Sequence, residues 1–468
     1  MDAKQKEKAM MEKDKVYQET LSTPIRYQCD VVVCGGGTAG FAAALASARN
    51  GAETILIDRN SYVGGSIVSG AGPLHSFFNL YKAFPGAKKQ QLVRGIAQEV
   101  IDRLVACNGS YGHLEQEKGG NYDSVITLLD WEIFKDEVLR MLEEAGVKIL
   151  LNTMITGVMR SGNTVQGIVI ESKSGREAIR AKVVIDTTGD GDVAALAGAV
   201  YTKKHDTTAV GFPFGMMNVD MKRLVAYLEE KEMVTQLIRG KKDGEDDVIR
   251  LGFDLKKDPR FTEFMKKNTM WGPLGFSYHA NNFNYINIVN KRNVDATDNE
   301  ACSKAVIELR HQAMELSGML VKYIPGFEHA YVSWTANGLG VRYTRVIDCE
   351  YDLSLEEITS GARFADEVLL YGFHDCAPRI MIRDAKCYGI PYRALLPRAI
   401  EGLLVAGRLI TGTWEAHMST RNTVSCIAQG EAVGTAAALC AREGCTPRAL
   451  DVQALRATLK SNGVYLGD

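Results

Sequence analysis

Short apolar runs and one small-residue helix pattern open the ordered part of the sequence. Val31–Val33 is a run of valines typical of a buried strand, and Thr54–Ile57 is a second apolar run. The alanine-rich stretch between them, residues 41–49, has the pattern of a helix packed on a sheet, and Gly51 ends it. The pattern predicts a strand–helix–strand unit over residues 29–58.

Two further apolar strands are predicted far along the chain, at residues 183–186 and 403–406. The first is followed by the polar run TTGDGD and the second by a Gly-Arg pair. A strand that ends in glycine and polar side chains at the edge of a parallel sheet is typical of a ligand crevice. We therefore expect both strand ends to converge on the same ligand as the first unit.

The pattern changes between residues 201 and 340, where charge clusters alternate with aromatic-rich stretches at 211–217 and 271–290. Residues 282–290 alternate with nearly period two, which predicts a strand with one polar face. Its asparagines either meet a substrate or face solvent. A long amphipathic helix is predicted near 299–322. We expect this region to form an inserted domain with both strands and helices.

The turn after the first strand carries the strongest chemical signal. Gly35, Gly37 and Gly40 have the spacing G-x-G-x-x-G. The first permits a tight turn, the second lets backbone approach a pyrophosphate, and the third lets the helix pack closely on the strand. The phosphates would lie at the helix N-terminus, and Asp58 at the end of the second strand could accept hydrogen bonds from a ribose. The unit predicts a bound dinucleotide.

The composition narrows the class of protein. Glycine is 45 of 468 residues, against an average share of about 7%, while proline is only 11. This excess indicates many places where backbone comes close to another group. Lys and Arg number 55 against 57 Asp and Glu, so no nucleic-acid or membrane-surface partner is expected. We find no run of about 18 uncharged apolar residues, which predicts no membrane span.

The ten cysteines contain no C-x-x-C pair, so neither a metal site nor dithiol redox chemistry is predicted. We interpret them as reduced thiols of a cytoplasmic protein. Residues 1–28 mix both charge signs without an apolar run, which argues against a secretory signal. We expect a charged N-terminal arm with helical character, either a partly ordered tail or a partner-binding segment.

A second glycine cluster at residues 60–72 stands where a nicotinamide-binding domain would continue into a helix. With it, the sequence resembles the FAD-dependent oxidoreductases of the glutathione-reductase-like superfamily, whose flavin domain is related to fumarate reductase and succinate dehydrogenase flavoproteins. The segments that carry the resemblance are Gly64-Gly65, LEEAGVKILLNTMITGV (142–158), IDTTGDGD (185–192), YIPGFEHA (323–330), VRYTRVI (341–347), YGIPYRALLPRAIEGLLVAGR (388–408) and HMSTR (417–421).

The resemblance implies FAD as the cofactor, with non-covalent binding favoured over covalent attachment through His75. It also implies that the N-terminus of a helix beginning near Ser425 stabilises negative charge on the reduced flavin. The residues that it assigns to FAD are Gly35, Gly37 and Gly40 for the pyrophosphate, Asp58 for the ribose, Gly64, Gly65 and Ser66 for the ribityl chain, Met154 for the adenine, and Thr38, Ala39, Arg59, Gly189, Asp190, Gly191, Gly407, Arg408, Arg421 and Gly434 for the remaining contacts.

The predicted fold class is α/β, with a Rossmann-like FAD-binding domain built on a parallel sheet and an inserted α+β substrate or cap domain. The expected divisions are the arm at 1–28, the first part of the FAD-binding domain at 29–200, the inserted domain at 201–340 and the C-terminal part of the FAD-binding domain at 341–468.

The catalytic candidates are His417, Arg421, His75 and Arg342. His417 and Arg421 resemble the His-x-x-x-Arg pair of the fumarate-reductase relatives, which holds a carboxylate against the flavin. Arg421 and Arg408 have an alternative role in bonding flavin phosphates or backbone carbonyls. The pair His374-Asp375 is interpreted as structural.

The expected function is hydride transfer between flavin N5 and a small organic substrate, by dehydrogenation or double-bond reduction. The sequence has no second G-x-G-x-x-G, so a separate electron donor or acceptor is expected. The alternative is a flavin-binding electron-transfer subunit of a larger redox complex. Assembly into a homo-oligomer is left open.

Overall fold

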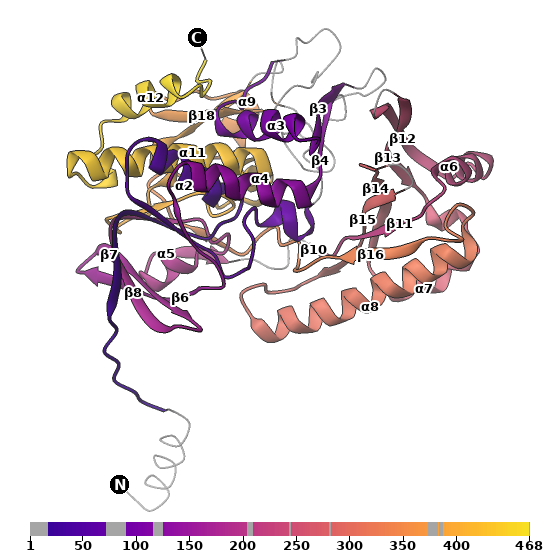
Figure 1. Ribbon diagram of the computed structural model, residues 1–468, viewed down its shortest axis with the longest axis horizontal. Helices are drawn as coiled ribbons and strands as arrows, with labels where there is room; N and C mark the ends of the chain where they lie inside the picture. The colour runs from indigo at the N-terminus through magenta and orange to yellow at the C-terminus, as the bar shows by residue number, and fades with distance from the viewer. Residues whose placement is uncertain are drawn as a thin grey trace, which may run out of the picture.

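A computed structural model describes residues 17–71, 90–115, 125–203, 209–242, 245–279, 282–372, 382 and 387–467. They form two halves, each with its own sheet and hydrophobic core (Figure 1). His75 and the His374-Asp375 pair lie outside the described residues.

The first half is built on a parallel sheet in the order β5-β2-β1-β8, with β20 also paired to β8. The valines of β1 explain its central place, because Val31–Val33 pair with β2 on one side and with β8 on the other and are fully buried. The strands are β1 (Ile25–Cys34), β2 (Thr54–Ile57), β5 (Lys148–Leu150), β8 (Gly175–Asp186) and β20 (Leu403–Val405). The expected α/β fold with a Rossmann-like parallel sheet is confirmed.

An antiparallel ribbon extends this sheet beyond β8. It consists of β7 (Thr164–Ser172) and β6 (Met154–Ser161). β1 begins at Ile25, and its first residues pair with Ala178–Arg180 of β8. The prediction that the arm reaches residue 28 is therefore wrong by four residues. Residues 17–24 have no regular structure, so the expected helical character is absent from this described part of the arm.

Two helices lie side by side on the first sheet, α2 (Thr38–Arg49) and α11 (Thr423–Glu443). A Cβ at Gly430 would lie 2.0 Å from Ala39 O, and one at Gly434 would lie 2.2 Å from Ala43 O. The two glycines therefore allow close helix packing. Gly434, which was predicted to contact the cofactor, lies inside α11 and packs against Ala43 of α2 instead.

α11 is also the one helix of the described chain that could cross a membrane by length and composition alone. However, 94% of its most apolar stretch is buried inside the fold. Its apolar character is accounted for by the core that it forms with α2 and the sheet.

The second half is an antiparallel sheet in the order β12-β13-β14-β15-β11-β16, with β10 paired to β15. The predicted strand and long helix are confirmed as β15 (Asn282–Arg292) and α8 (Asn299–Tyr323). The other strands are β10 (Ala209–Gly211), β11 (Phe214–Met217), β12 (Val234–Lys242), β13 (Glu245–Phe253), β14 (Met270–Phe276) and β16 (Tyr331–Thr335). Their core includes residues of α8, α6 (Met221–Glu230) and α7 (Thr262–Lys267).

The two halves meet through an aromatic cluster. The hairpin of β3 (Ser110–Glu115) and β4 (Val125–Leu129) belongs to the first half and shares a core with residues of β12 to β15. Tyr111 and Tyr278 have ring centroids 4.8 Å apart, and Trp131 and Trp334 lie 4.9 Å apart. The second sheet therefore packs against the first half as well as against its own helices.

The remaining elements complete the first half. They are α3 (Ile96–Ala106), α4 (Trp131–Glu144), α5 (Asp192–Leu196), β9 (Tyr201–Lys203) paired with β17 (Arg345–Ile347), α9 (Leu355–Ser360), β18 (Glu367–Tyr371) paired with β19 (Tyr388–Pro391), α10 (Trp414–Thr420) and α12 (Val452–Ser461).

Candidate cofactor and active site

Four parallel strands end at one edge of the first sheet. The residues that follow β1, β2, β8 and β20 are Gly35, Asp58, Thr187 and Ala406. Backbone bonds join these ends, because the Thr187 amide donates to Cys34 O (2.9 Å) and the Ala406 amide donates to Asp186 O (3.1 Å). Ligands of such sheets bind outside the carboxyl ends of the strands, so this edge is the candidate site.

At Gly35 and Gly40, the backbone of the protein leaves no room for a Cβ. Gly35 has φ +99°, and a Cβ there would lie 2.7 Å from Thr187 O. A Cβ at Gly40 would lie 1.7 Å from Gly35 O. These are the tight turn and the close helix packing that the spacing predicts.

Gly37 has a different setting, since no protein contact requires a glycine there. Its backbone, with φ −69° and ψ −165°, is open to any residue. A Cβ would meet nothing closer than Thr187 O at 3.9 Å and Gly65 Cα at 4.0 Å. Any larger side chain would extend into the space beside the start of α2. This setting agrees with the role expected of the second glycine of the motif, which is to let a pyrophosphate approach the backbone.

Two helices present uncapped N-termini at this edge. Gly37 precedes α2 and Asn422 precedes α11, and neither gives a side-chain cap or has an acidic residue in its first turn. The pairing of Gly430 with Ala39 and of Gly434 with Ala43 makes the two helices run in the same direction. Their free N–H groups and dipoles therefore favour negative charge at the same edge.

Asp58 is held between the two glycine-rich turns. Its Oδ2 accepts the Gly36 amide (2.6 Å), and its Oδ1 accepts the Asn60 amide and side chain (2.7 and 2.9 Å). Burial raises the pKa of Asp58, and these hydrogen bonds offset only part of the rise. A buried carboxylate beside the start of α2 suits a ribose hydroxyl.

The second glycine turn packs directly on the first. The Gly64 amide donates to Gly36 O (2.8 Å), and a Cβ at Gly65 would lie 2.7 Å from Gly37 Cα. Ser66 is exposed beside them. The predicted adenine contact is also adjacent, because the Thr153 amide donates to Asp58 O (3.0 Å) and Met154 follows with half of its surface exposed. Arg59 is exposed.

The buried Asp190 and the partly buried Arg408 form an ion pair that bridges the ends of β8 and β20. Arg408 Nη2 donates to Asp190 Oδ1 (2.7 Å), and the Thr344 hydroxyl donates to the same oxygen (2.8 Å). Burial alone would raise the pKa of Asp190, but the charge of Arg408 and the Thr344 hydrogen bond hold it below its ordinary value. The carboxylate is therefore ionised and paired.

The glycines on either side of Asp190 serve this arrangement. Gly189 has φ +80° and would place a Cβ 3.3 Å from Arg408 Nη2. Gly191 has φ +66°, and a Cβ there would lie 2.7 Å from Ile347 Cδ1. Both positions are thus explained by contacts within the protein.

His417 does not have the setting of a catalytic residue. It is fully buried, and its ring nitrogens face Ile410 O (3.2 Å) and Arg342 O (3.0 Å). Burial lowers its pKa to about 4, and the charges of Arg421 and Arg408 act in the same direction. This geometry favours a structural role for His417 over the predicted catalytic one, because both ring nitrogens face backbone carbonyls. The side chain instead holds the loop after β20 to residue 342.

That loop contains a strained residue, Thr411, with φ +75°. A β-branched residue rarely adopts this conformation, and such strain is concentrated at functional sites. The turn is held from several sides: Thr420 Oγ1 donates to Thr411 Oγ1 (3.1 Å), Tyr343 OH donates to Gly412 O (3.1 Å) and the Gly412 amide donates to Asp352 (2.8 Å). Residue type alone does not predict this conformation.

Gln429 is a further site residue that the sequence did not single out. Its Oε1 accepts the Gly407 amide (2.9 Å), and its Nε2 donates to Thr420 O (2.8 Å). It therefore joins α11 to the turn after β20 and to the end of α10. The sequence signal that could have identified it is an amide side chain within a stretch of mostly small and apolar residues.

The two arginine candidates occupy different places. Arg342 Nη1 donates to Ala209 O (2.8 Å) in the second half. Arg421 caps the end of α10, and its Nε lies 3.3 Å from Met418 Sδ. Arg342 therefore lies where the two halves join, and Arg421 lies beside the start of α11.

Comparison with known proteins decides the family. A family model described as FAD dependent oxidoreductase matches residues 30–459. The chain belongs to this family. The description of this family names FAD as the cofactor and oxidation–reduction as the class of reaction.

Curated relatives match parts of this flavoprotein. The digeranylgeranylglycerophospholipid reductase of Methanoculleus marisnigri is 30% identical over 162 residues, which are 34% of this chain and 38% of that enzyme. The urocanate reductase of Eggerthella lenta is 28% identical over 193 residues, which are 39% of this chain and 29% of that enzyme. The chain thus matches less than half the length of these two enzymes.

Solved structures of similar architecture cover more of the flavoprotein at low identity. A p-nitrophenol 4-monooxygenase from Pseudomonas putida is 12% identical, with a TM-score of 0.48 and coverage of 94% of this chain and 90% of that one. A geranylgeranyl bacteriochlorophyll reductase-like protein from Thermoplasma acidophilum is 13% identical, with a TM-score of 0.42 and coverage of 93% and 82%.

The buried position of His417 leads to a stability prediction. We expect His417→Ala to lower the free energy of unfolding by about 2–4 kcal/mol, because it removes a fully buried ring and its polar contacts. Urea denaturation of the FAD-loaded flavoprotein measures the loss. The matched control is His311→Ala, which removes an exposed histidine of α8 and should change stability by less than about 0.5 kcal/mol. Equal effects of the two changes would contradict the assignment.

A buried acid on α11, Glu431, contacts the start of α3. Its Oε2 accepts the Ile96 amide at the start of α3 (3.1 Å). Burial raises its pKa to about 8, with a further contribution from Glu99, while the Ile96 hydrogen bond and the charge of Arg49 offset part of the rise. The acid therefore keeps its proton in the folded state at neutral pH.

Glu431 should make the stability of the flavoprotein depend on pH. The folded-state pKa lies above the ordinary value of 4.5, so the contribution is complete below that value and is lost as the pH rises to about 8. Glu431→Gln keeps the shape without the titration. We expect the free energy of unfolding of the variant, relative to wild type, to increase by roughly 2–4 kcal/mol between pH 5 and pH 8. A pH-independent difference would exclude this behaviour.

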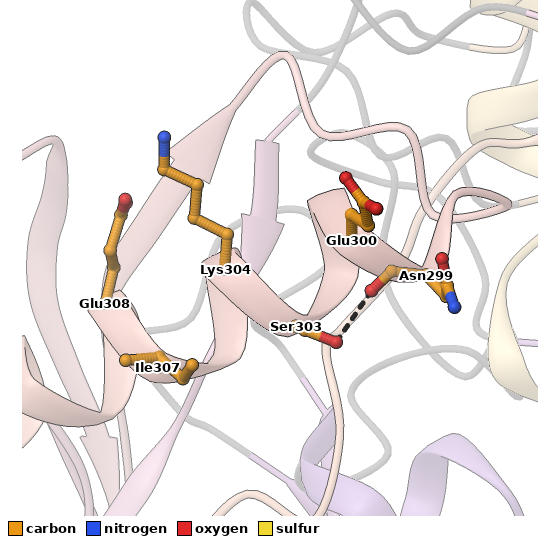
Figure 2. A pocket seen from close by; sticks show the side chains of 6 residues that line it. All are labelled: Asn299, Glu300, Ser303, Lys304, Ile307 and Glu308. Carbon is orange, nitrogen blue, oxygen red and sulfur yellow. Dashed lines mark hydrogen bonds between the residues drawn. The ribbon is translucent and has the colours of Figure 1, made fainter.

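A hollow of about 510 Å³ lies over the N-terminal part of α8 (Figure 2). Its described lining residues are Asn299, Glu300, Ser303, Lys304, Ile307 and Glu308. All of them belong to one helix, and the drawn contact is the Ser303 hydroxyl bond to Asn299 O (2.7 Å). This side of α8 brings together no residues predicted for chemistry, so it is not assigned as the active site.

Proposed function

We propose that the chain binds FAD non-covalently along the carboxyl edge of its parallel sheet and transfers hydride between the flavin and a small organic substrate. The observation that carries the proposal is the setting of Gly37: neither backbone nor packing requires a glycine there, and the adjoining space lies at an uncapped helix N-terminus. A phosphate-bearing ligand explains both features.

The residues that would hold FAD follow the strand ends. The amides of Thr38, Ala39 and Gly40 would face the pyrophosphate, and Asp58 would bind the ribose next to the adenine at Met154. At the other end of the crevice, the start of α11 would meet the flavin. The set that completes the site is Gly35, Arg59, Gly64, Gly65, Ser66, Gly189, Asp190, Gly191, Gly407, Arg408 and Arg421.

When bound, FAD supplies a carrier of two electrons that exchanges hydride with a substrate carbon. The protein contributes the charge and the packing around the flavin. The uncapped start of α11 favours negative charge in the reduced state. The Asp190–Arg408 pair and the loop held by His417 keep the ends of β8 and β20 in place. The aromatic contact between the two halves holds the second sheet against the first half.

The substrate would lie where the second sheet meets the first half, beside Arg342. Two of the matched relatives are reductases by name, which favours reduction as the direction of the reaction. The electrons would come from a separate donor. We also propose a cytoplasmic location.

Anaerobic stopped-flow with the FAD-loaded protein tests this function. A panel of small organic acids, enoates and alcohols is screened for reoxidation of the photoreduced protein or for reduction of the oxidised protein. We expect at least one compound to change the flavin oxidation state catalytically. If only a protein partner exchanges electrons, the electron-transfer alternative holds instead. A parallel series with free FAD controls for reactions that need no protein.

A further inference from the structure

Asn290 on β15 carries a buried polar atom with no partner. The side chain is 1% exposed, and its Nδ2 donates to Ile288 O (3.2 Å). Its Oδ1 accepts no hydrogen bond. Exchanging the two amide atoms would set Oδ1 against a carbonyl oxygen, so the orientation is fixed. A buried amide oxygen left unpaired costs about 1–3 kcal/mol, which a sequence retains only for a reason.

The amide faces the first half of the molecule. The next residue, Lys291, is hydrogen-bonded to Glu308 of α8, and successive side chains of a strand point to opposite faces. Asn290 therefore points away from α8. Figure 1 shows β10, its partner strand, at the margin of the second sheet that adjoins the first half.

Two glycines, Gly211 and Gly340, lie beside Asn290 on the neighbouring segments and form a row with it across the sheet. Asn290 pairs with Gly211, and Gly211 exchanges backbone hydrogen bonds with Gly340 (3.2 and 2.8 Å). Neither glycine has a side chain to cover the neighbouring amide. No side chain at these two partner positions therefore lies over the buried amide.

The same row leads to the cofactor crevice. Thr344, which bonds Asp190, follows Gly340 by four residues and so lies within about 14 Å of it. Between them, Arg342 donates to Ala209 O (2.8 Å), and its own carbonyl contacts His417. Ala209 pairs with the strand two residues beyond Asn290. The permanently charged guanidinium of Arg342 thus contacts β10, the strand that pairs with Asn290.

We propose that Asn290 and Arg342 form the recognition site for the substrate, which is a small organic acid with a hydroxyl, amide or ring N–H donor close to its acidic group. The donor would pair with Asn290 Oδ1, and the acidic group would meet the charge of Arg342. This inference rests on the proposed function and names the substrate class of the same site.

The probes are L-malate and succinate, which differ by one hydroxyl donor. Each is titrated into the FAD-loaded protein, and binding is followed by the change in flavin absorbance. We expect the wild type to bind malate about tenfold more tightly than succinate, the effect of one hydrogen bond to a buried acceptor. Asn290→Leu should remove this preference while FAD remains bound. An unchanged preference, or no binding of either acid, overturns the proposal.

A stability measurement separates recognition from a structural role. Asn290→Leu should leave the melting temperature of the FAD-loaded protein unchanged or raised, because it removes an unpaired polar atom. The matched control is Asn268→Leu, since Asn268 is also buried but donates to Phe264 O (3.0 Å) at the end of α7. The control should melt several degrees lower. An equal loss for Asn290→Leu would show a structural role instead.

Asn290→Ala gives the same comparison if the leucine variant does not fold, because alanine also lacks a hydrogen-bond acceptor. A failure of the recognition site leaves a protein that holds FAD and reacts with other compounds. A failure of the proposed function leaves a protein without FAD or without flavin redox turnover, so the two failures are distinguishable.

Discussion

Replacement of Gly37 by valine should give a folded protein that no longer retains FAD. The backbone at Gly37 accepts valine without strain, but the side chain would fill the space beside the start of α2. We expect FAD affinity to fall at least 100-fold, because the pyrophosphate would lose its approach to several amide groups. Flavin absorbance after gel filtration measures retention, and circular dichroism confirms folding. The change should cost α2 only about 1 kcal/mol as a poorer N-cap.

Gly318→Ala is the matched control for this change. Gly318 lies in α8, and a Cβ there would meet nothing within 4 Å. The control should retain FAD at the wild-type level and be as stable or slightly more stable. Stoichiometric FAD in Gly37→Val would show that the cofactor does not use this space.

Replacement of Arg408 by leucine should produce the largest loss of stability. It leaves the Asp190 carboxylate, which is 7% exposed, without its cation. Removing one partner of a buried ion pair costs about 3–5 kcal/mol. Urea denaturation of the apoprotein measures the loss without a contribution from FAD. In the same assay, Arg408→Leu with Asp190→Asn should recover part of the loss, because the buried charge is gone.

The Asp190–Arg408 ion pair also determines how the stability of the protein changes with pH. Since the folded-state pKa lies below the ordinary 3.8, the contribution is present above that value and is lost as the pH falls through the folded-state pKa. Arg408→Leu should therefore weaken the acid sensitivity below pH 4. The control is Arg398→Leu, which breaks an ion pair with Asp348 whose side chains are 57% and 39% exposed. This change should cost less than about 1 kcal/mol, and a similar loss for both arginines would refute the buried-pair account.

The sequence predicted the first half well because its signals are local. Buried strands show as apolar runs, and the G-x-G-x-x-G spacing places three glycines on one turn with separate roles. Gly35 and Gly40 have the predicted roles, and Gly37 has the open space expected for a ligand. The predicted strand at 282–290 and helix at 299–322 also rest on periodicity within single elements.

The errors come from residues whose role depends on distant neighbours. Gly434 and Gly37 both lie in glycine-rich stretches, and the sequence does not tell their roles apart. Gly434 packs against Ala43 of α2, which only the fold brings near. His417 looked catalytic because of its spacing to Arg421. In the fold, one of its ring nitrogens faces the carbonyl of Arg342, which is 75 residues away in the sequence.

Two other features, at Thr411 and Asn290, are not predicted by any pattern in the sequence. Thr411 adopts a backbone conformation that threonine disfavours, because the surrounding hydrogen bonds impose it. Asn290 follows the alternating pattern of β15, which fits either a polar solvent face or a buried recognition group. Its burial and its unpaired oxygen are properties of the packed molecule.

The most direct test of the account is the cofactor content of the purified wild-type protein. The flavin absorbance spectrum is recorded, the protein is denatured, and the released cofactor is identified and quantified by chromatography against FAD, FMN and NAD standards. The account predicts about one FAD per chain, released without covalent attachment, and a marked loss of FAD in Gly37→Val. A colourless protein that releases NAD, or one that neither contains nor takes up FAD, would contradict it.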